Sequence, residues 1–150
     1  MTRQLLTTLA AAGSFALLAG AYTFEFFGYP PCQMCYWQRW PHFVAIAIGI
    51  IAYFIPARIL AYLGASAALI TSGIGLFHTG VERDWWEGPA SCTGGGLGGL
   101  DASDLLSTDG PRLVMCDQVS WEFLTLSMAS WNALFSLGLA LIWLAAARRT

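Results

Sequence analysis

Long apolar runs constrain this chain more than any other feature of its sequence. Residues 5–27 are apolar or small for 23 positions, apart from scattered Thr and Ser and from Glu25. At a rise of 1.5 Å per residue, a helix of this length crosses the hydrocarbon layer of about 30 Å. Residues 59–77 and 129–147 each add 19 residues of the same kind. We therefore expect an all-α membrane protein, a bundle of four transmembrane helices, with these runs as three of the four.

The remaining apolar run is short. Residues 41–55 number only 15, fewer than the ~20 that a spanning helix needs. Beginning the helix near Cys35 restores the length and predicts a span at 36–55. Pro41 then lies in or just after the first turn, where its missing N–H is tolerated or bends the helix.

The first run has an alternative interpretation. Arg3, an apolar stretch and the small residues at 19–21 are also typical of a secretory signal peptide. The apolar run continues through Tyr22 and on to Phe27, which favours a helix that stays in the membrane. The expected span is therefore 5–27.

Charge is distributed unevenly along the chain. Seven of the nine acidic residues lie between Glu82 and Asp117, against two arginines, which gives this segment a net charge of −5. Such a segment does not fit in lipid, so we expect residues 78–128 to form a long aqueous loop between the third and fourth helices of one domain, 1–150. The chain has no lysine and no basic stripe, which gives no support to a nucleic-acid role.

Four of the five arginines outside this loop indicate the orientation. Arg3, Arg58 and the pair Arg148 and Arg149 all fall on one side of the four expected spans. The positive-inside rule places them, and both termini, in the cytoplasm. We therefore expect a multi-pass protein of the cell inner membrane, with membrane lipid around it and loop 78–128 in the periplasm. Within the loop, residues 94–99 are glycine-rich and flexible, and 119–126 suit a short element on the membrane surface.

All four cysteines fall at or beyond the ends of apolar runs. Cys32 and Cys35 are two residues apart, whereas Cys92 and Cys116 lie in the loop. Outside the cytoplasm thiols oxidise, so we expect Cys32–Cys35 and Cys92–Cys116 disulfides. A purely structural role is reasonable for Cys92–Cys116, because this cross-link should stabilise the fold by about 3–3.5 kcal/mol. It is a poor explanation for Cys32–Cys35, whose short ring should contribute only about 2 kcal/mol. A CxxC pair in this position indicates redox activity.

Zinc is another use of four cysteines. Structural zinc sites usually combine two close pairs, and this chain has one close pair, so we expect no metal. If Cys35 begins a helix, the helix dipole favours its thiolate. Arg39, four residues later, shares its face. We expect Arg39 to stabilise the thiolate and the anionic forms of an electron acceptor, although an interfacial arginine also often extends to the head groups.

These residues occur in a characteristic order. Pro31-Cys32-x-x-Cys35-x-x-x-Arg39 precedes His78-Thr79, and Cys116-x-x-x-x-Trp121-x-Phe123-Leu124 follows. In order, spacing and expected topology, residues 5–147 resemble the bacterial DsbB family of disulfide-bond formation proteins. Members of that family are four-helix inner-membrane enzymes. They reoxidise DsbA, a periplasmic thioredoxin-fold protein, and pass the electrons to a membrane quinone, ubiquinone or menaquinone.

The resemblance implies roles for the four cysteines. Cys92 would form a mixed disulfide with the DsbA-like partner, and Cys116 would be its mate. Cys116 would also pair transiently with Cys32, which frees Cys35 as a thiolate against the quinone ring.

The resemblance also implies a quinone site. Arg39 would bind the quinone, and His78 is a weaker candidate for the same site, since a lone histidine at a helix end is often simply interfacial. Gln38 departs from the family pattern, which often has an acid before the arginine. Pro41 is unusual so soon after it.

Two other functions compete with this one. A quinone reductase of the vitamin K epoxide reductase type also has four helices, but its catalytic CxxC falls late in the chain, whereas here it precedes the second helix. A non-enzymatic membrane protein with two structural disulfides is the other alternative. The residues and the resemblance together favour a quinone-dependent enzyme that oxidises protein dithiols.

Overall fold

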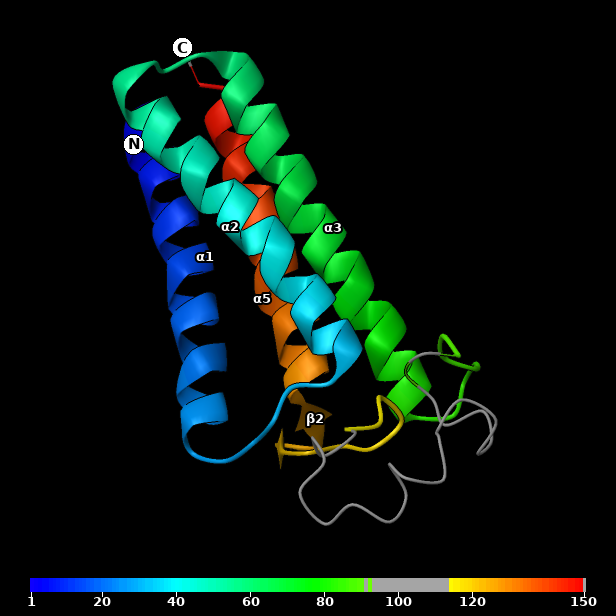
Figure 1. Ribbon diagram of the computed structural model, residues 1–150. Helices are drawn as coiled ribbons and strands as arrows, with labels where there is room; N and C mark the ends of the chain where they lie inside the picture. The colour runs from blue at the N-terminus through cyan, green and yellow to red at the C-terminus, as the bar shows by residue number, and fades with distance from the viewer. Residues whose placement is uncertain (91, 93–113, 150) are drawn as a thin grey trace.

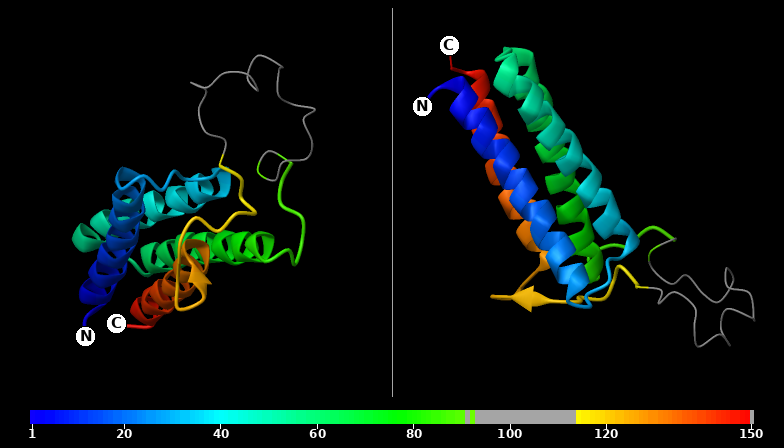
Figure 2. Two further views of the ribbon diagram at one scale, coloured as in Figure 1. Left: turned by 90° about the horizontal axis from the view of Figure 1, so that it is seen from below. Right: turned by 60° about the vertical axis from the view of Figure 1, so that its left-hand side comes forward.

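The computed structural model describes residues 1–90, 92 and 114–149 of the chain. Over these residues the protein is mostly helical, and its long helices pack side by side as a bundle (Figure 1). They are α1 (Arg3–Phe26), α2 (Gln33–Phe54), α3 (Arg58–Glu82) and α5 (Met128–Ala147). Both termini lie at one end of the bundle, and the segments that carry the cysteines lie at the other (Figures 1 and 2).

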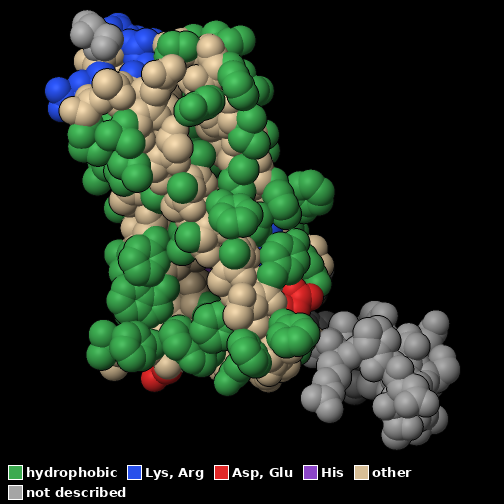
Figure 3. Space-filling view, turned by 90° about the vertical axis from the view of Figure 1, so that its left-hand side faces the viewer, with side chains coloured by type: hydrophobic (Ala, Val, Ile, Leu, Met, Phe, Trp, Pro, Cys, Tyr) green, Lys and Arg blue, Asp and Glu red, His purple; other side chains and the backbone are tan. Residues whose placement is uncertain are grey.

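Helix length and surface composition indicate a membrane protein. Among the described helices, α1, α3 and α5 are long and apolar enough to cross a membrane. Large apolar side chains also cover much of the outside of the bundle (Figure 3). A surface of this kind is far more apolar than that of a soluble monomer. Helix α2 has 22 residues, but polar side chains such as Gln38 and Arg39 occupy its first two turns, and it is not among the three.

Helix α2 begins earlier than the sequence indicated. Its first residue is Gln33 rather than residue 36, because Cys32 caps the helix: the Cys32 sulfur accepts the N–H of Cys35 at 3.3 Å. Pro41 lies inside the helix, which continues to Phe54. The apolar run starts later than the helix because the first two turns bear polar and reactive side chains.

Helix α3 ends later than expected, at Glu82 rather than residue 77. The added turns carry His78 and Thr79, both of them buried. The Thr79 hydroxyl bonds the carbonyl of Gly75 and lies 3.0 Å from the Ser130 hydroxyl on α5. His78 therefore lies within a helix, not in the loop. Polar residues continue this helix because their partners are inside the bundle, which an apolar-run criterion does not detect.

Near the termini the helices pack through small residues around one large ring. Trp143 on α5 is fully buried, and a Cβ added to Gly64 on α3 would lie 2.5 Å from its ring. Small residues let helix backbones approach closely, which is how helices associate in lipid. The other buried members of this cluster are mostly alanines: Leu6, Ala10, Ala61, Ala65, Ala68, Ala140, Ala146 and Ala147.

The charged side chains separate between the two ends of the bundle. Basic side chains gather beside the termini, and acidic ones are seen toward the opposite end (Figure 3). Arg3 donates to the carbonyls of Pro56 and Arg149, which ties the first turn of α1 to the α2–α3 turn and to the end of α5. The arginines at 3, 58, 148 and 149 thus share one end, as the sequence predicted.

Residues 119–126, expected as a surface element, contribute to a short hairpin. Strands β1 (Glu122–Phe123) and β2 (Leu126–Ser127) pair antiparallel at the base of α5. Leu124 and Thr125 between them have φ values of 51° and 65°. A two-residue hairpin loop of type I′ has positive φ at both positions. The glycine-rich residues 94–99 lie outside the described part of the chain.

Candidate active site

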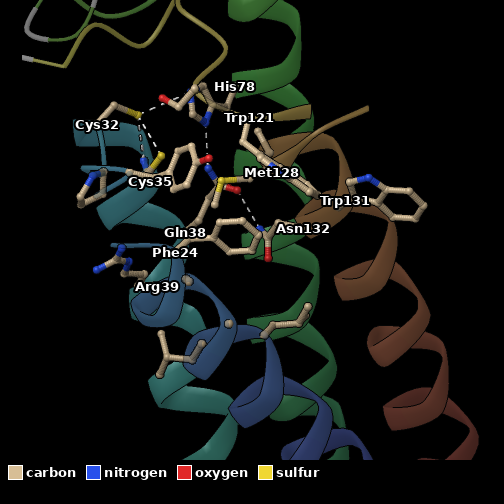
Figure 4. A pocket seen from close by; sticks show the side chains of 18 of the residues that line it. Phe24, Cys32, Cys35, Gln38, Arg39, His78, Trp121, Met128, Trp131 and Asn132 are labelled. Carbon is tan, nitrogen blue, oxygen red and sulfur yellow. Dashed lines mark hydrogen bonds between the residues drawn. The ribbon is translucent and has the colours of Figure 1, made fainter. Parts of the chain in front are cut away.

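A cavity of about 420 Å³ lies at the cysteine end of the bundle. All four long helices and the hairpin contribute to its walls, most of which are apolar (Figure 4). Ala21 and Phe24 come from α1, and Trp131 and Phe135 come from α5. The polar or reactive groups that reach it include Cys32, Cys35, Gln38, Arg39, His42, His78, Glu82 and Asn132.

The CxxC pair lies at the start of α2, beside this cavity. Cys32 is buried and Cys35 is partly buried, and both are free thiols. Their Sγ atoms are 3.1 Å apart, a hydrogen-bonding distance for sulfur and longer than a disulfide bond. The expected Cys32–Cys35 disulfide is therefore not formed in the structure. The prediction was wrong for this state because compartment and spacing indicate which thiols can pair, and not which redox state a pair holds.

The second pair, Cys92 and Cys116, is joined as a disulfide, as expected. Both residues are buried, and the Cys116 N–H donates to the Cys92 carbonyl at 2.7 Å. The Sγ atoms of Cys32, Cys92 and Cys116 all lie within 4.8 Å of one another. The structure thus brings the free thiol at the start of α2 against the disulfide of the outer loop.

Cys32, rather than Cys35, is the capping residue of α2. Hydrogen bonding from the Cys35 thiol lowers the pKa of Cys32 to about 4, with help from His78 and against the effect of burial. We expected the helix dipole to favour a thiolate at Cys35. The structure assigns the cap, and the lowered pKa, to Cys32, because the helix begins at Gln33.

His78 lies directly against Cys32. Its Nε2 is 3.5 Å from the Cys32 sulfur and 3.9 Å from Oε1 of Glu82, one helical turn further on (Figure 4). The Ser127 hydroxyl donates to the other oxygen of Glu82. The sequence marked His78 as a weak candidate for cofactor binding. Its nearest reactive neighbour is instead a cysteine.

Arg39 is held by an acid and two aromatic rings. Its Nη1 lies 2.6 Å from Oε2 of Glu25 on α1. The guanidinium carbon is 4.5 Å from the ring centroid of Tyr22 and 5.0 Å from that of Tyr36, distances typical of cation–π contacts. The Arg39 Nε is buried and, among the described residues, has no hydrogen-bond partner. Arg39 is therefore a fixed, paired cation among the residues that line the cavity.

A buried polar network joins α2, α3 and α5 below the thiols. Gln38, His42, Thr71 and Asn132 are linked by hydrogen bonds, including His42 Nε2 to Asn132 Oδ1 at 3.0 Å. Sequence reasoning gave these residues no role, and it also missed the partner of Arg39, Glu25. A signal was available, because polar residues inside apolar spans mark functional sites.

Comparison with known proteins identifies the family. The family described as "Disulfide bond formation protein DsbB" matches residues 3–146. The chain belongs to the DsbB family. Proteins named "Disulfide bond formation protein B" from Polaromonas sp. (strain JS666) and Xanthomonas oryzae pv. oryzae (strain MAFF 311018) are 28% and 33% identical to it. These matches cover 96% and 91% of this chain and 89% and 84% of the relatives.

A third relative of the same name, from Polaromonas naphthalenivorans, is 30% identical over 85% of the chain and 80% of its own length. No solved structure matches the chain with significance. Membership of the DsbB family supports a role in disulfide bond formation, and the family name implies a disulfide-forming oxidoreductase. The geometry agrees with this chemistry, because all four cysteines gather at one end of the bundle.

Proposed function

We propose that this DsbB-family protein oxidises a DsbA-like dithiol protein in the periplasm and passes the electrons to a membrane quinone. The observation that carries the proposal is the row of four sulfur atoms. Cys32 lies within 4.8 Å of both loop sulfurs, and Cys35 lies 3.1 Å beyond it, against the cavity. Thiol–disulfide exchange needs a thiolate beside a disulfide sulfur, and this row supplies both.

The first exchange takes place at the outer pair. A thiolate of the partner attacks Cys92, the Cys92–Cys116 bond breaks, and Cys116 leaves as a thiolate. The partner's second thiol then closes the partner's own disulfide and releases Cys92. The partner loses two electrons and the loop pair gains two.

The second exchange moves the same two electrons inward. With Cys32 and Cys35 joined, the Cys116 thiolate attacks Cys32, and Cys35 leaves as a thiolate. Cys92 then displaces Cys32 from Cys116 and re-forms the loop disulfide. The state seen in the structure, with Cys92–Cys116 joined and the CxxC pair free, corresponds to the end of this sequence.

The cavity residues fit a quinone. A flat apolar ring suits walls formed by Phe24, Trp131 and Phe135, and a ring oxygen suits the guanidinium of Arg39, which lines the same cavity. Bound there, a quinone supplies a two-electron acceptor that is soluble in the membrane. Cys35 lines the same cavity. In the proposed order of transfer it is the last thiol before the quinone.

The proposed site needs the loop pair in the periplasm, which agrees with the charge distribution. The arginines beside the termini favour a cytoplasmic position for that end under the positive-inside rule. The cysteine end then faces an oxidising compartment, where disulfides persist. We therefore propose the cell inner membrane as the location, with α2 as the fourth spanning helix.

Purified full-length protein in detergent micelles tests the proposal. A reduced thioredoxin-fold dithiol protein and a short-chain quinone are added without oxygen, and quinone absorbance and partner thiols are followed together. We expect one quinone reduced for each partner disulfide formed. Ser72→Ala removes a hydrogen bond between α3 and α5 outside the cavity and should keep this activity, whereas Cys35→Ser should lose it. Quinone loss that Cys35→Ser leaves unchanged, or no quinone loss at all, would contradict the proposal.

A further inference from the structure

Gln38 is the centre of a hydrogen-bonded chain across three helices. Its Nε2 lies 3.0 Å from Nδ1 of His78 on α3, and its Oε1 accepts from Nδ2 of Asn132 on α5 at 2.8 Å (Figure 4). Its side chain is buried. A buried amide with partners on both sides is held in one orientation, and that orientation decides which proton each partner carries.

Two backbone carbonyls fix the direction of these bonds. Gln38 Nε2 also meets the carbonyl of Met34 at 3.2 Å, and a carbonyl only accepts. The Thr71 hydroxyl donates to the Gln38 carbonyl at 2.9 Å, so Thr71 is free to accept from Asn132 Nδ2 at 3.1 Å. The Met34 carbonyl fixes the position of Gln38 Nε2 directly. Thr71 fixes it through Asn132, because Asn132 Nδ2 then faces Gln38 Oε1. Both bonds therefore place the amide nitrogen of Gln38 toward His78. His78 Nδ1 is therefore the acceptor.

This assignment determines the other nitrogen of the ring. In a neutral imidazole that accepts at Nδ1, the proton is on Nε2. Nε2 is the atom that lies 3.5 Å from the Cys32 sulfur. The ring therefore offers a hydrogen-bond donor to Cys32, and a donor stabilises a thiolate over a thiol.

We propose that Gln38 is a positioning residue, which holds His78 in the tautomer that donates to Cys32 and thereby stabilises the Cys32 thiolate, the group that leaves when Cys92 re-forms the loop disulfide. The inference deepens the proposed function and rests on it, since it concerns the same exchange of sulfur pairs. Among the described residues, no hydrogen bond joins Gln38 to a cysteine sulfur. Its effect on Cys32 passes through His78.

Other titratable groups also face this pair. The Sγ of Cys35 on α2 lies 3.1 Å from that of Cys32, and the pair Cys92 and Cys116 packs against Cys32 as a disulfide. Glu82 on α3 lies 3.9 Å from His78 Nε2 and is hydrogen-bonded by Ser127 from the base of α5. On the α1 side, Glu25 is paired with Arg39. The test must therefore separate the effect of Gln38 from the effects of these other titratable groups. A substitution that changes only the Gln38 amide does so.

The rate at which iodoacetamide alkylates Cys32, followed against pH by peptide mass spectrometry, measures the thiolate directly. The full-length protein in detergent micelles is used, with Cys92–Cys116 joined. Gln38→Leu removes the donor to His78 Nδ1 and should move the midpoint upward by about one pH unit, which is about tenfold less thiolate below the midpoint. A change in access alone would alter the plateau rate and leave the midpoint in place.

His78→Gln provides the matched background. A glutamine at 78 offers an amide N–H near the place of the histidine Nε2–H and has no tautomers, so it needs no amide at 38 to orient it. In this background Gln38→Leu should leave the midpoint unchanged. Such non-additivity is the signature of one residue acting through another. Equal shifts in both backgrounds would overturn the inference.

Asn132→Leu tests the same chain one step further away, and it serves if Gln38→Leu does not fold. Loss of the donor to Gln38 Oε1 should raise the midpoint by a smaller amount, and an unchanged midpoint overturns the inference. These measurements need neither a partner nor a quinone. An unchanged pH midpoint therefore does not contradict the proposed function. Failure of the quinone assay, in turn, does not affect the measured midpoint.

Discussion

The two ends of the helix bundle are built from different side chains. At the end with the termini, Trp143 is enclosed by glycine and alanine, with helices in close contact. At the cysteine end, Gln38, His78 and Asn132 are joined by hydrogen bonds beside a cavity of about 420 Å³. The first end stabilises the fold by packing, and the second orients reactive groups. The comparison indicates that stability and activity depend on different residues and can be changed separately.

The largest expected effect is on activity alone. Cys35→Ser removes the thiol that would pass electrons to the quinone in the proposed order, so quinone-linked dithiol oxidation should fall to background. The substitution changes one atom, and the free energy of unfolding should change by less than about 1 kcal/mol. Enzyme assay and denaturant unfolding of the same sample measure both. A large loss of stability would show that the cysteine end also carries the fold.

Trp143→Ala should have the opposite result. Removing the fully buried ring leaves a cavity at the packed end, and the free energy of unfolding should fall by about 3–5 kcal/mol. The pH midpoint of Cys32 alkylation should not move, because Trp143 is outside the site. Unfolding monitored by circular dichroism gives the first quantity. A shifted midpoint would mean that the two ends are coupled.

The reactivity of Cys32 should depend on pH in one direction. Because its pKa is lowered to about 4, the thiolate is present above this pH, and alkylation should slow about tenfold for each pH unit below it. A lowered pKa also stabilises the folded state above the usual thiol pKa, and this contribution is lost as pH falls toward 4. Alkylation rates between pH 3 and pH 9 give the profile; a midpoint near the usual thiol value would contradict the geometry around Cys32.

Arg39→His should affect only the electron acceptor. The substitution removes the guanidinium from the cavity lining, and KM for quinone should rise about tenfold, roughly 1.4 kcal/mol. Affinity for the dithiol partner should be unchanged, because Arg39 lies on the cavity side of the thiols. Steady-state kinetics with each substrate varied in turn separates the two. Equal losses of activity toward quinone and toward the dithiol partner would show that Arg39 does not act specifically at the quinone site.

The smallest effect is expected where one interhelical hydrogen bond lies away from both ends. Ser72 donates to the Ala133 carbonyl at 2.8 Å. Such bonds within a membrane contribute about 0.6 kcal/mol on average, so Ser72→Ala should cost about that much stability and no activity. Thermal or denaturant unfolding measures it. A reduced turnover in Ser72→Ala would show that the active site extends further down the bundle than the cavity.

The sequence predicted the packed end better than the reactive end. Apolar runs reveal helices because each residue contributes independently to transfer into lipid. The limits of α2 and α3 were missed at Gln33 and Glu82, since their terminal turns are polar and find their partners inside the bundle. A run of apolar residues carries no information about such turns.

The site was predicted as a set of residues and not as an arrangement. The four cysteines, Arg39 and His78 were all identified from spacing and from the resemblance. That His78 contacts Cys32, and that Glu25 pairs with Arg39, depends on how three helices are rotated about their axes. Helix rotation is set by packing of small residues along the whole bundle. A single sequence does not give it.

The central claim is that the two sulfur pairs exchange through Cys32 and Cys116. The most direct test maps disulfides in the quinone-oxidised protein after it reacts with a reduced partner whose second thiol is replaced by serine, followed by acid quenching and alkylation. The partner then stays bound to Cys92, the released Cys116 thiolate attacks Cys32, and Cys35 leaves, so we expect a Cys32–Cys116 cross-link with Cys35 alkylated. The matched variant Cys32→Ser has no inner disulfide to attack and should leave Cys116 alkylated. A mixed disulfide at Cys92 with Cys116 alkylated and Cys32–Cys35 still joined would contradict the account.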